Sequence, residues 1–256
     1  MKRLFASITV CLALLLAPAA RAQGPASQPR VLVFFSLNTE NDHMLFATDA
    51  LRFLAEQADR HGFRVEATTD WNDLNDQKLA QYQMVVWLND FPGSAAQRAA
   101  FEKFMEGGGA WLGCHVSAYT DKNSKWTWFR SFIGAGVFGL NNWPPLPAKL
   151  IVDDATSPIT KGLPASFISP TDEWYSWRPS PRLAPNIHVL LTLDPSNYPL
   201  GIKSILTDKD GDVPVVWTNT KYRMIYMNMG HGDQVFASPI QNQLIQNEIL
   251  WLLHKN

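Results

Sequence analysis

The sequence predicts an α/β fold, a three-layer sandwich in which helices cover both faces of a mostly parallel central sheet. Short, nearly continuous apolar runs recur along the first half of the chain, which is the pattern of strands buried on both faces. Between them lie segments whose apolar residues recur at helical spacing. Such alternation of strand and helix is typical of βαβ units. The 256 residues are 46% hydrophobic and 18% charged, which excludes a disordered chain and is enough for one large core.

The first half of the chain contains the clearest elements. Strands are predicted at residues 31–35, 63–67 and 84–88, and a fourth begins at residues 110–112. The apolar spacing of residues 47–58 predicts a helix after the first strand, and Gly62 ends it. Ser94, followed three residues later by Gln97, predicts a capping box at the start of a second helix.

The second half is less regular. Residues 126–139 are expected to form a short helix running into a glycine-rich loop, and strands are expected at 149–152, 188–193, 213–217 and 224–227. Ser238, Pro239 and Gln241 mark the start of a C-terminal helix. Without an internal repeat or a long linker, residues 30–256 are interpreted as a single domain, preceded by a polar tail at 23–29.

The N-terminus has the features of a secretory signal peptide. Lys2 and Arg3 precede an apolar run at 4–16, and Ala20 and Ala22 are small residues at the positions that a signal peptidase reads. The run is shorter than the roughly 20 residues that a bilayer requires, and no other long apolar run follows. We therefore predict residues 1–22 to be a cleaved leader, with a periplasmic or secreted protein and no membrane span in the mature chain.

Charge and cysteine content exclude several classes of function. The net charge of −1 offers no basic surface for nucleic acid. Only Cys114 would remain after cleavage, so an internal disulfide is excluded and stability must come from core packing. An exported protein meets little ATP or NAD(P)H, which disfavours a kinase or a dehydrogenase. The expected partner is a small molecule, and the oligomeric state is open, a homo-oligomer included.

Three of the six histidines follow predicted strands, where an open parallel sheet binds its ligands. These are His43, His115 and His231, and Asn89 follows another strand. The other three histidines, His61, His188 and His254, are interpreted as structural residues at helix or strand ends.

The segment Gly113-Cys114-His115 is the most specific local signal. A strand that ends in glycine and turns sharply into a helix resembles a nucleophile elbow. The G-x-C-x-G elbow of class I glutamine amidotransferases, laid on Gly113, places His115 at the nucleophile position. Neighbouring side chains of an extended segment point to opposite sides, so Cys114 should face the core as a small hydrophobe. A downstream glutaminase His-x-Glu is also missing, so glutamine hydrolysis is excluded.

The elbow and three further motifs resemble the ThuA-like (trehalose utilisation) family. The motifs are residues 157–164, Asp172-Glu173-Trp174-Tyr175, and residues 214–217 leading to Gly230-His231-Gly232. The resemblance implies a flavodoxin-like core related to class I glutamine amidotransferases but without their catalytic cysteine, and a role in the metabolism of trehalose and other sugars. Ser157 departs from the family, which often has His there.

Carried over by position, the resemblance gathers His43, His115, Glu173 and His231, with Asp172 alongside. Two chemistries fit this set and remain open. The three imidazoles and a carboxylate could hold Zn²⁺ or a similar ion with an open position for water. Alternatively, His115, His231 and Glu173 could act without metal as general acid and base. A third alternative is a non-catalytic carbohydrate-binding or scaffolding protein.

Aromatic side chains are frequent in the same segments, and their flat rings suit the faces of sugars. They are Trp126, Trp128, Trp143, Trp174, Tyr175 and Trp177. We expect a sugar to contact His43, Asn89, Asp172, Trp126, Trp174 and Trp177. The leading hypothesis is an enzyme that hydrolyses or isomerises a glycoside or keto-sugar, with His115, His231 and Glu173 as catalytic residues.

Overall fold

The computed structural model describes residues 28–120, 123–134, 136–196 and 212–255. The predicted signal peptide and its cleavage site lie outside the described residues. No helix in these four ranges is both long and apolar enough to cross a bilayer.

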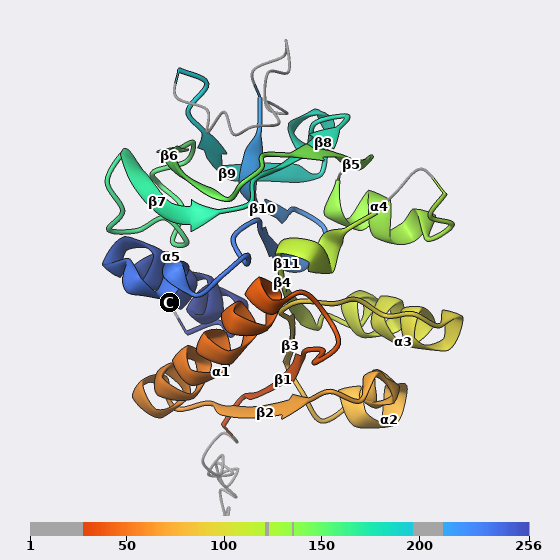
Figure 1. The fold of residues 1–256 in the computed structure, drawn as a ribbon. Coiled ribbons are helices and arrows are strands. Elements are labelled where there is room, and N and C mark those ends of the chain that lie inside the picture. The colour runs from red at the N-terminus through yellow and green to blue at the C-terminus, as the bar shows by residue number, and fades with distance from the viewer. Residues whose placement is uncertain (1–27, 121–122, 135, 197–211, 256) are drawn as a thin grey trace, which may run out of the picture.

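A nine-stranded sheet forms the centre of the molecule (Figure 1). In spatial order it consists of β2 (Arg64–Thr68), β1 (Arg30–Phe34), β3 (Met84–Trp87), β4 (Ala110–Cys114), β11 (Arg223–Met227), β10 (Pro214–Asn219), β9 (Ile187–Leu193), β6 (Leu146–Val152) and β7 (Ser166–Asp172). The pairings from β2 to β11 are parallel, and those from β11 to β7 are antiparallel. The α/β fold class is therefore confirmed, and the antiparallel half is a feature that the apolar runs did not predict.

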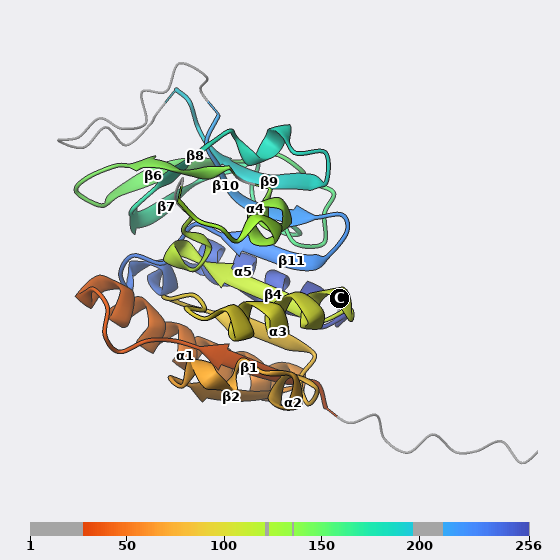
Figure 2. The ribbon, with the colours of Figure 1, turned by 90° about the vertical axis from the view of Figure 1, so that its right-hand side faces the viewer.

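Helices cover both faces of the sheet (Figures 1 and 2). On one face lie α1 (Asn41–His61) and α5 (Pro239–Leu252), and on the other lie α2 (Asp76–Leu79), α3 (Ala95–Glu106) and α4 (Thr127–Ile133). Short 3-10 helices are η1 (Trp71–Asp73), η2 (His115–Ala118), η3 (Pro181–Leu183) and η4 (Gln234–Ala237). Each face of the sheet has its own hydrophobic core cluster. Phe46 of α1 and Ile249 of α5 belong to one cluster, and Phe101 of α3 and Phe129 of α4 belong to the other.

The helix boundaries follow their predicted signals. Gly62 closes α1 in the left-handed conformation, with a φ of 67°, which costs little without a Cβ. Ser94 and Gln97 form both hydrogen bonds of the capping box at α3. The Ser238 hydroxyl accepts from the backbone N–H of Gln241 at the start of α5.

Two parts of the middle differ from the sequence prediction. The expected glycine-rich loop is wrong for residues 137–139, because they begin β5 (Val137–Asn141), which pairs with β8 (Tyr175–Arg178) in a small second sheet. β7 was also missed, because Pro170 interrupts its apolar pattern; the strand lies at the sheet edge, where proline is tolerated. These missed elements matter, because the turn between β7 and β8 contributes to the site.

Candidate functional site

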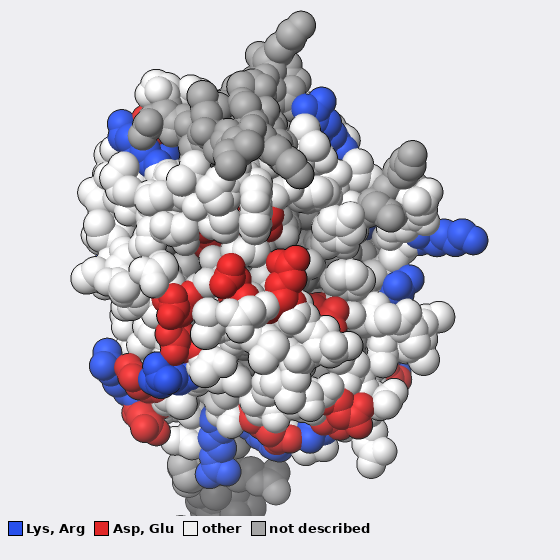
Figure 3. Space-filling view, viewed as in Figure 1, with Lys and Arg blue, Asp and Glu red and all other residues white. Residues whose placement is uncertain are grey.

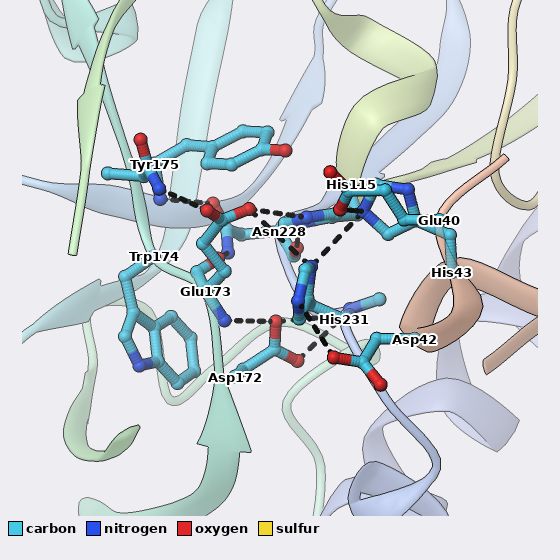
Figure 4. A network of polar contacts seen from close by, with 12 residues as sticks. Glu40, Asp42, His43, His115, Asp172, Glu173, Trp174, Tyr175, Asn228 and His231 are labelled. Atoms are coloured by element: carbon cyan, nitrogen blue, oxygen red, sulfur yellow. Dashed lines mark hydrogen bonds and ion pairs between the residues drawn. The ribbon is translucent and has the colours of Figure 1, made fainter. Parts of the chain in front are cut away.

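Four buried side chains meet at the carboxyl end of the parallel strands (Figure 4). His43 lies in the first turn of α1, and His115 begins η2 directly after β4. Glu173 lies between β7 and β8, and His231 follows β11. Each offers one nitrogen or oxygen, and these four atoms all lie within 4.8 Å of one another. We call these four residues the His/Glu cluster. Their convergence, predicted from the resemblance, is confirmed.

His115 has a strained backbone conformation and packs tightly against the backbone of Gly230. Its φ is 48°, an unfavourable value for a residue with a Cβ and typical of a nucleophile elbow. A Cβ on Gly230 would lie 2.4 Å from the His115 Cβ, so only glycine fits beside it. The hydroxyl of Tyr226 donates to the His115 carbonyl at 3.1 Å. The elbow and the loop after β11 therefore fix each other.

The thiol of Cys114 points away from this site, as expected. It is 2% exposed and packs in the same core cluster as Phe46 and Ile249. Burial, with the nearby carboxyls of Glu248 and Asp172, raises the pKa of the thiol well above its usual value. Because the thiolate is the reactive form, Cys114 is not a nucleophile at neutral pH.

Hydrogen bonds fix which nitrogen of two imidazoles carries the proton. His115 Nδ1 lies 2.7 Å from the carbonyl oxygen of Asn228, which can only accept, so Nδ1 carries the proton in the neutral tautomer and Nε2 is the nitrogen that can present a lone pair. That Nε2 is buried without an aligned hydrogen bond and lies 3.3 Å from Glu173 Oε2. His231 Nε2 lies 3.2 Å from the Asp42 carboxylate, which leaves Nδ1 as the lone pair that faces the cluster. Such outer partners are those that orient histidine ligands of metals.

His43 has a partner that suits either tautomer. Its Nδ1 lies 3.3 Å from the Thr39 hydroxyl, which can donate or accept, and its Nε2 lies 3.2 Å from His231 Nδ1. Nε2 can therefore donate to His231 or present its lone pair to an ion, with Thr39 changing its role accordingly.

Two imidazoles of the cluster, those of His43 and His231, have lowered pKa values. Burial, and then the nearby His115 and His231, lower the pKa of His43 to about 3. Burial and His115 also lower the pKa of His231. Burial acts to raise the pKa of Glu173, but the neighbouring imidazoles of His115, His231 and His43 outweigh this and hold the pKa below its usual value. Two neutral imidazoles and an ionised carboxylate are the protonation states that metal ligation requires.

Asp172 and Asn228 hold the surrounding loops together. The fully buried Asp172 carboxylate accepts backbone N–H groups from Glu173 (2.8 Å), Gly230 (3.0 Å) and His231 (3.2 Å). Burial raises the pKa of Asp172 to about 7, although His115 and these three donors favour the charged form. The Asn228 amide donates to the Glu173 carbonyl at 2.9 Å and accepts from the backbone N–H of Tyr175 at 2.9 Å.

Three of the six separations between donor atoms are close to those expected around a small divalent cation. In a tetrahedral site with Zn–N distances of 2.0–2.1 Å, neighbouring donors lie about 3.4 Å apart. Three pairs of donor atoms in the cluster lie 3.2, 3.3 and 3.5 Å apart. The His/Glu cluster could therefore hold Zn²⁺ or a similar ion.

A cavity of about 320 Å³ opens beside the cluster. His43 and Glu173 line it, so a molecule in the cavity can reach the cluster. The remaining lining residues are Glu40, Val116, Tyr119, Phe138, Asn141, Trp143 and Tyr175.

Several residues expected to contact a sugar are placed elsewhere, and these expectations are corrected. Trp126 stacks on Phe129 of α4, with 4.5 Å between the rings, and does not line the cavity. Trp174 and Trp177 are 0% and 4% exposed and belong to the two core clusters. Asn89 uses its amide on the backbone of Ser36 and His43, so it positions the start of α1. Asp172 is likewise fully buried and engaged with backbone N–H groups.

Other functional residues were missed by the sequence reasoning. Asn228 orients His115, and Asn141 donates to Glu173 Oε1. The signal for Asn228 was available, because it is a polar residue between a predicted buried strand and the Gly230-His231-Gly232 motif. Asn141 lies on the unpredicted strand β5, so nothing in the pattern pointed to it.

Comparisons with known proteins agree with this architecture. The family described as "ThuA: Trehalose utilisation" matches residues 30–252. A solved ThuA-like protein from Bacteroides uniformis is 45% identical, with a TM-score of 0.85, over 92% of this chain and 96% of that one. A ThuA-like protein from Parabacteroides merdae is 19% identical, with a TM-score of 0.64, over 89% and 91% of the two chains. No match was found among curated proteins.

A more distant similarity concerns the fold alone. A β-galactosidase from Bacillus circulans is 11% identical, with a TM-score of 0.54, over 87% of this chain but only 31% of that one. The mixed, largely parallel sheet flanked by helices is like the class I glutamine amidotransferase-like fold, as expected. With the family match spanning nearly all of the described residues and a close solved relative, the chain belongs to the ThuA family, which is linked to trehalose and carbohydrate utilisation.

Proposed function

We propose that this chain is an exported, metal-dependent enzyme that hydrolyses or isomerises a glycoside or keto-sugar at the His/Glu cluster. The observation that carries the proposal is the convergence of one donor atom from each of four buried residues, all within 4.8 Å of one another. The sugar class is supported by the family's link to trehalose utilisation. Export is supported by the leader-like sequence at residues 1–22.

The ligands would be His43 Nε2, His115 Nε2, His231 Nδ1 and a Glu173 oxygen. A divalent ion there would make a bound water more acidic or polarise a sugar carbonyl. Asn141 donates to Glu173 Oε1, which leaves Oε2 for the cluster. Because the pKa of Glu173 is lowered, its carboxylate is ionised at neutral pH and can ligate the ion or accept a proton from substrate.

Tyr175 gives the cavity a hydroxyl that stays protonated. Its ring packs 4.2 Å from the His115 ring, and burial, followed by Glu173, raises the pKa of the phenol. The hydroxyl can therefore donate a hydrogen bond to a sugar oxygen throughout the neutral range. The His/Glu cluster would therefore provide an ion-binding site, Glu173 a base, and Tyr175 a hydrogen-bond donor to the substrate.

The first test is the metal content of protein purified without a histidine tag. We expect about one divalent ion per chain in the wild type and loss of most of it in His115→Ala and in His231→Ala. His188→Ala is the matched control, because His188 is an exposed histidine outside the cluster. The metal site would be refuted if the wild-type protein is purified without metal and does not bind Zn²⁺, Mn²⁺ or Co²⁺ in titrations.

The second test is turnover on a panel of glycosides and keto-sugars. His115→Ala and His231→Ala should abolish turnover, while their melting temperatures in chelator stay close to that of the wild type. Unfolding of both variants would assign these residues a structural role. Turnover that survives chelation would favour metal-free acid and base catalysis, and stoichiometric sugar binding without product would favour a non-catalytic binding protein.

A further inference from the structure

The cavity beside the His/Glu cluster has the size of a single sugar ring. Its volume of about 320 Å³ corresponds to about ten water molecules, at ~30 Å³ each. This is near the lower end of ligand pockets, which span roughly 300–1,000 Å³. A bound ring would have the cluster on one side, because His43 and Glu173 are part of the lining.

Aromatic side chains form much of the remaining wall. Tyr119 follows η2, and its ring lies 5.1 Å from that of Phe138 on β5. Trp143 follows β5 and stands at 90° to the His231 ring, 6.3 Å away. Tyr119 and Trp143 are 38% and 45% exposed, although large rings are usually buried.

Trp143 is unusual among the tryptophans. All ten lie within the described ranges, and the other nine are buried or partly buried. An exposed indole at the rim of a cavity presents a flat apolar face with a polar edge, which matches the C–H face of a pyranose. Its position next to His231 would place a stacked ring at the cluster.

The mouth of the cavity is acidic. The Glu40 side chain is 71% exposed and lines the cavity, and the Asp42 side chain is 49% exposed and pairs with His231. Among the described residues that line the cavity, none is a lysine or an arginine. Figure 3 shows the molecule in the orientation of Figure 1. Acidic side chains gather near the centre of the visible face, whereas the basic side chains lie toward its periphery.

We infer that Trp143, Tyr119 and Phe138, with Glu40 at the mouth, form a subsite for one ring of a neutral sugar and disfavour anionic sugars. The inference rests on the proposed function and names the substrate class of its site. The pyranose face would lie on the aromatic side chains, with its hydroxyls toward Glu173 and Tyr175. A sugar phosphate or uronate would instead bring its charge close to Glu40 and Asp42.

The aromatic part is tested by titration calorimetry of the metal-loaded protein. The neutral probes are the methyl glycosides of glucose, galactose and mannose. We expect Trp143→Ala to weaken binding of the best probe by about tenfold and Trp143→Phe to restore part of it. Leu183→Ala is the matched control, because Leu183 is 75% exposed but does not line the cavity, and it should leave binding unchanged.

The acidic part is tested with methyl glucuronoside as the charged counterpart of the glucoside. Glu40→Gln should strengthen glucuronoside binding at least about twofold relative to glucoside binding, since only the charge is removed. Glu40 makes no side-chain cap hydrogen bond to α1, so this change preserves the helix. Glu56→Gln, an exposed change farther along α1, is the control.

Failure of this inference can be separated from failure of the proposed function. Absence of binding for all three neutral probes, or equal affinity in Trp143→Ala and wild type, would overturn the sugar subsite even if the metal content remains stoichiometric. Tighter wild-type binding of the glucuronoside than of the glucoside would overturn the preference for neutral sugars. Absence of metal, with sugar binding that still depends on Trp143, would overturn the proposed metal chemistry alone.

Discussion

The pH dependence of stability offers a quantitative test of the buried histidines. The pKa of His43 falls from 6.5 in the unfolded chain to about 3 in the folded, metal-free protein. Between these values the unfolded chain binds a proton that the folded chain does not, so stability is lost as the pH falls. From pH 7 to pH 5, His43 alone should lower the free energy of unfolding by about 2 kcal/mol. The lowered pKa of His231 acts in the same direction.

The measurement is urea denaturation of chelator-treated protein at pH 7 and pH 5, for wild type and for His43→Gln. The variant should lose about 2 kcal/mol less than wild type on acidification, because its side chain does not titrate. His61→Gln, at the last residue of the same helix, is the control and should retain most of the wild-type loss. An equal loss in His43→Gln and wild type would show that burial of His43 does not suppress its protonation, and the reasoning would be refuted.

Three further predictions concern the scaffold of the site. Gly230→Ala would place a methyl group 2.4 Å from the His115 Cβ. We therefore expect urea denaturation to show a loss of about 1–3 kcal/mol in the free energy of unfolding, and metal binding to be weaker. Wild-type stability and wild-type metal affinity would contradict this packing. Asp172→Asn should cost about 1–3 kcal/mol, because an amide cannot accept all three backbone N–H groups that converge there; an unchanged urea midpoint would argue against this network. Cys114 should resist a thiol reagent in the native protein and react fully in guanidinium, and rapid native labelling would show that it is accessible.

The first half of the fold could be predicted from sequence because local pattern and burial coincide there. The strands β1, β3 and β4 are buried on both faces, so their residues are continuously apolar. The ends of α1 and α3 are set by Gly62 and by the Ser94 capping box, which are local signals. The edge strand β7 and the short strand β8 lack such signals, because the former contains a proline and the latter has no continuous apolar run.

The site was predictable in its central residues but not in its periphery. His115 was found because an elbow is a local sequence motif, and its positive φ agrees with that reading. His43 and His231 were expected near it because they follow predicted strands, whereas Glu173 was added only through the resemblance. Trp174 and Trp177 were expected to contact a sugar, yet whether an aromatic ring faces a cavity or the core depends on the packing of β8 against β5.

The order in which the chain is made has a consequence for the cluster. His43 and His231 are separated by 188 positions in the sequence. Glu173 lies in the connection between β7 and β8, which are both in the second half of the chain. An incomplete chain, even one with its first four strands paired, would lack two of the four donors. Acquisition of an ion would therefore report completed folding of the whole polypeptide, and a bound ion would act as a cross-link that slows the separation of its early and late segments.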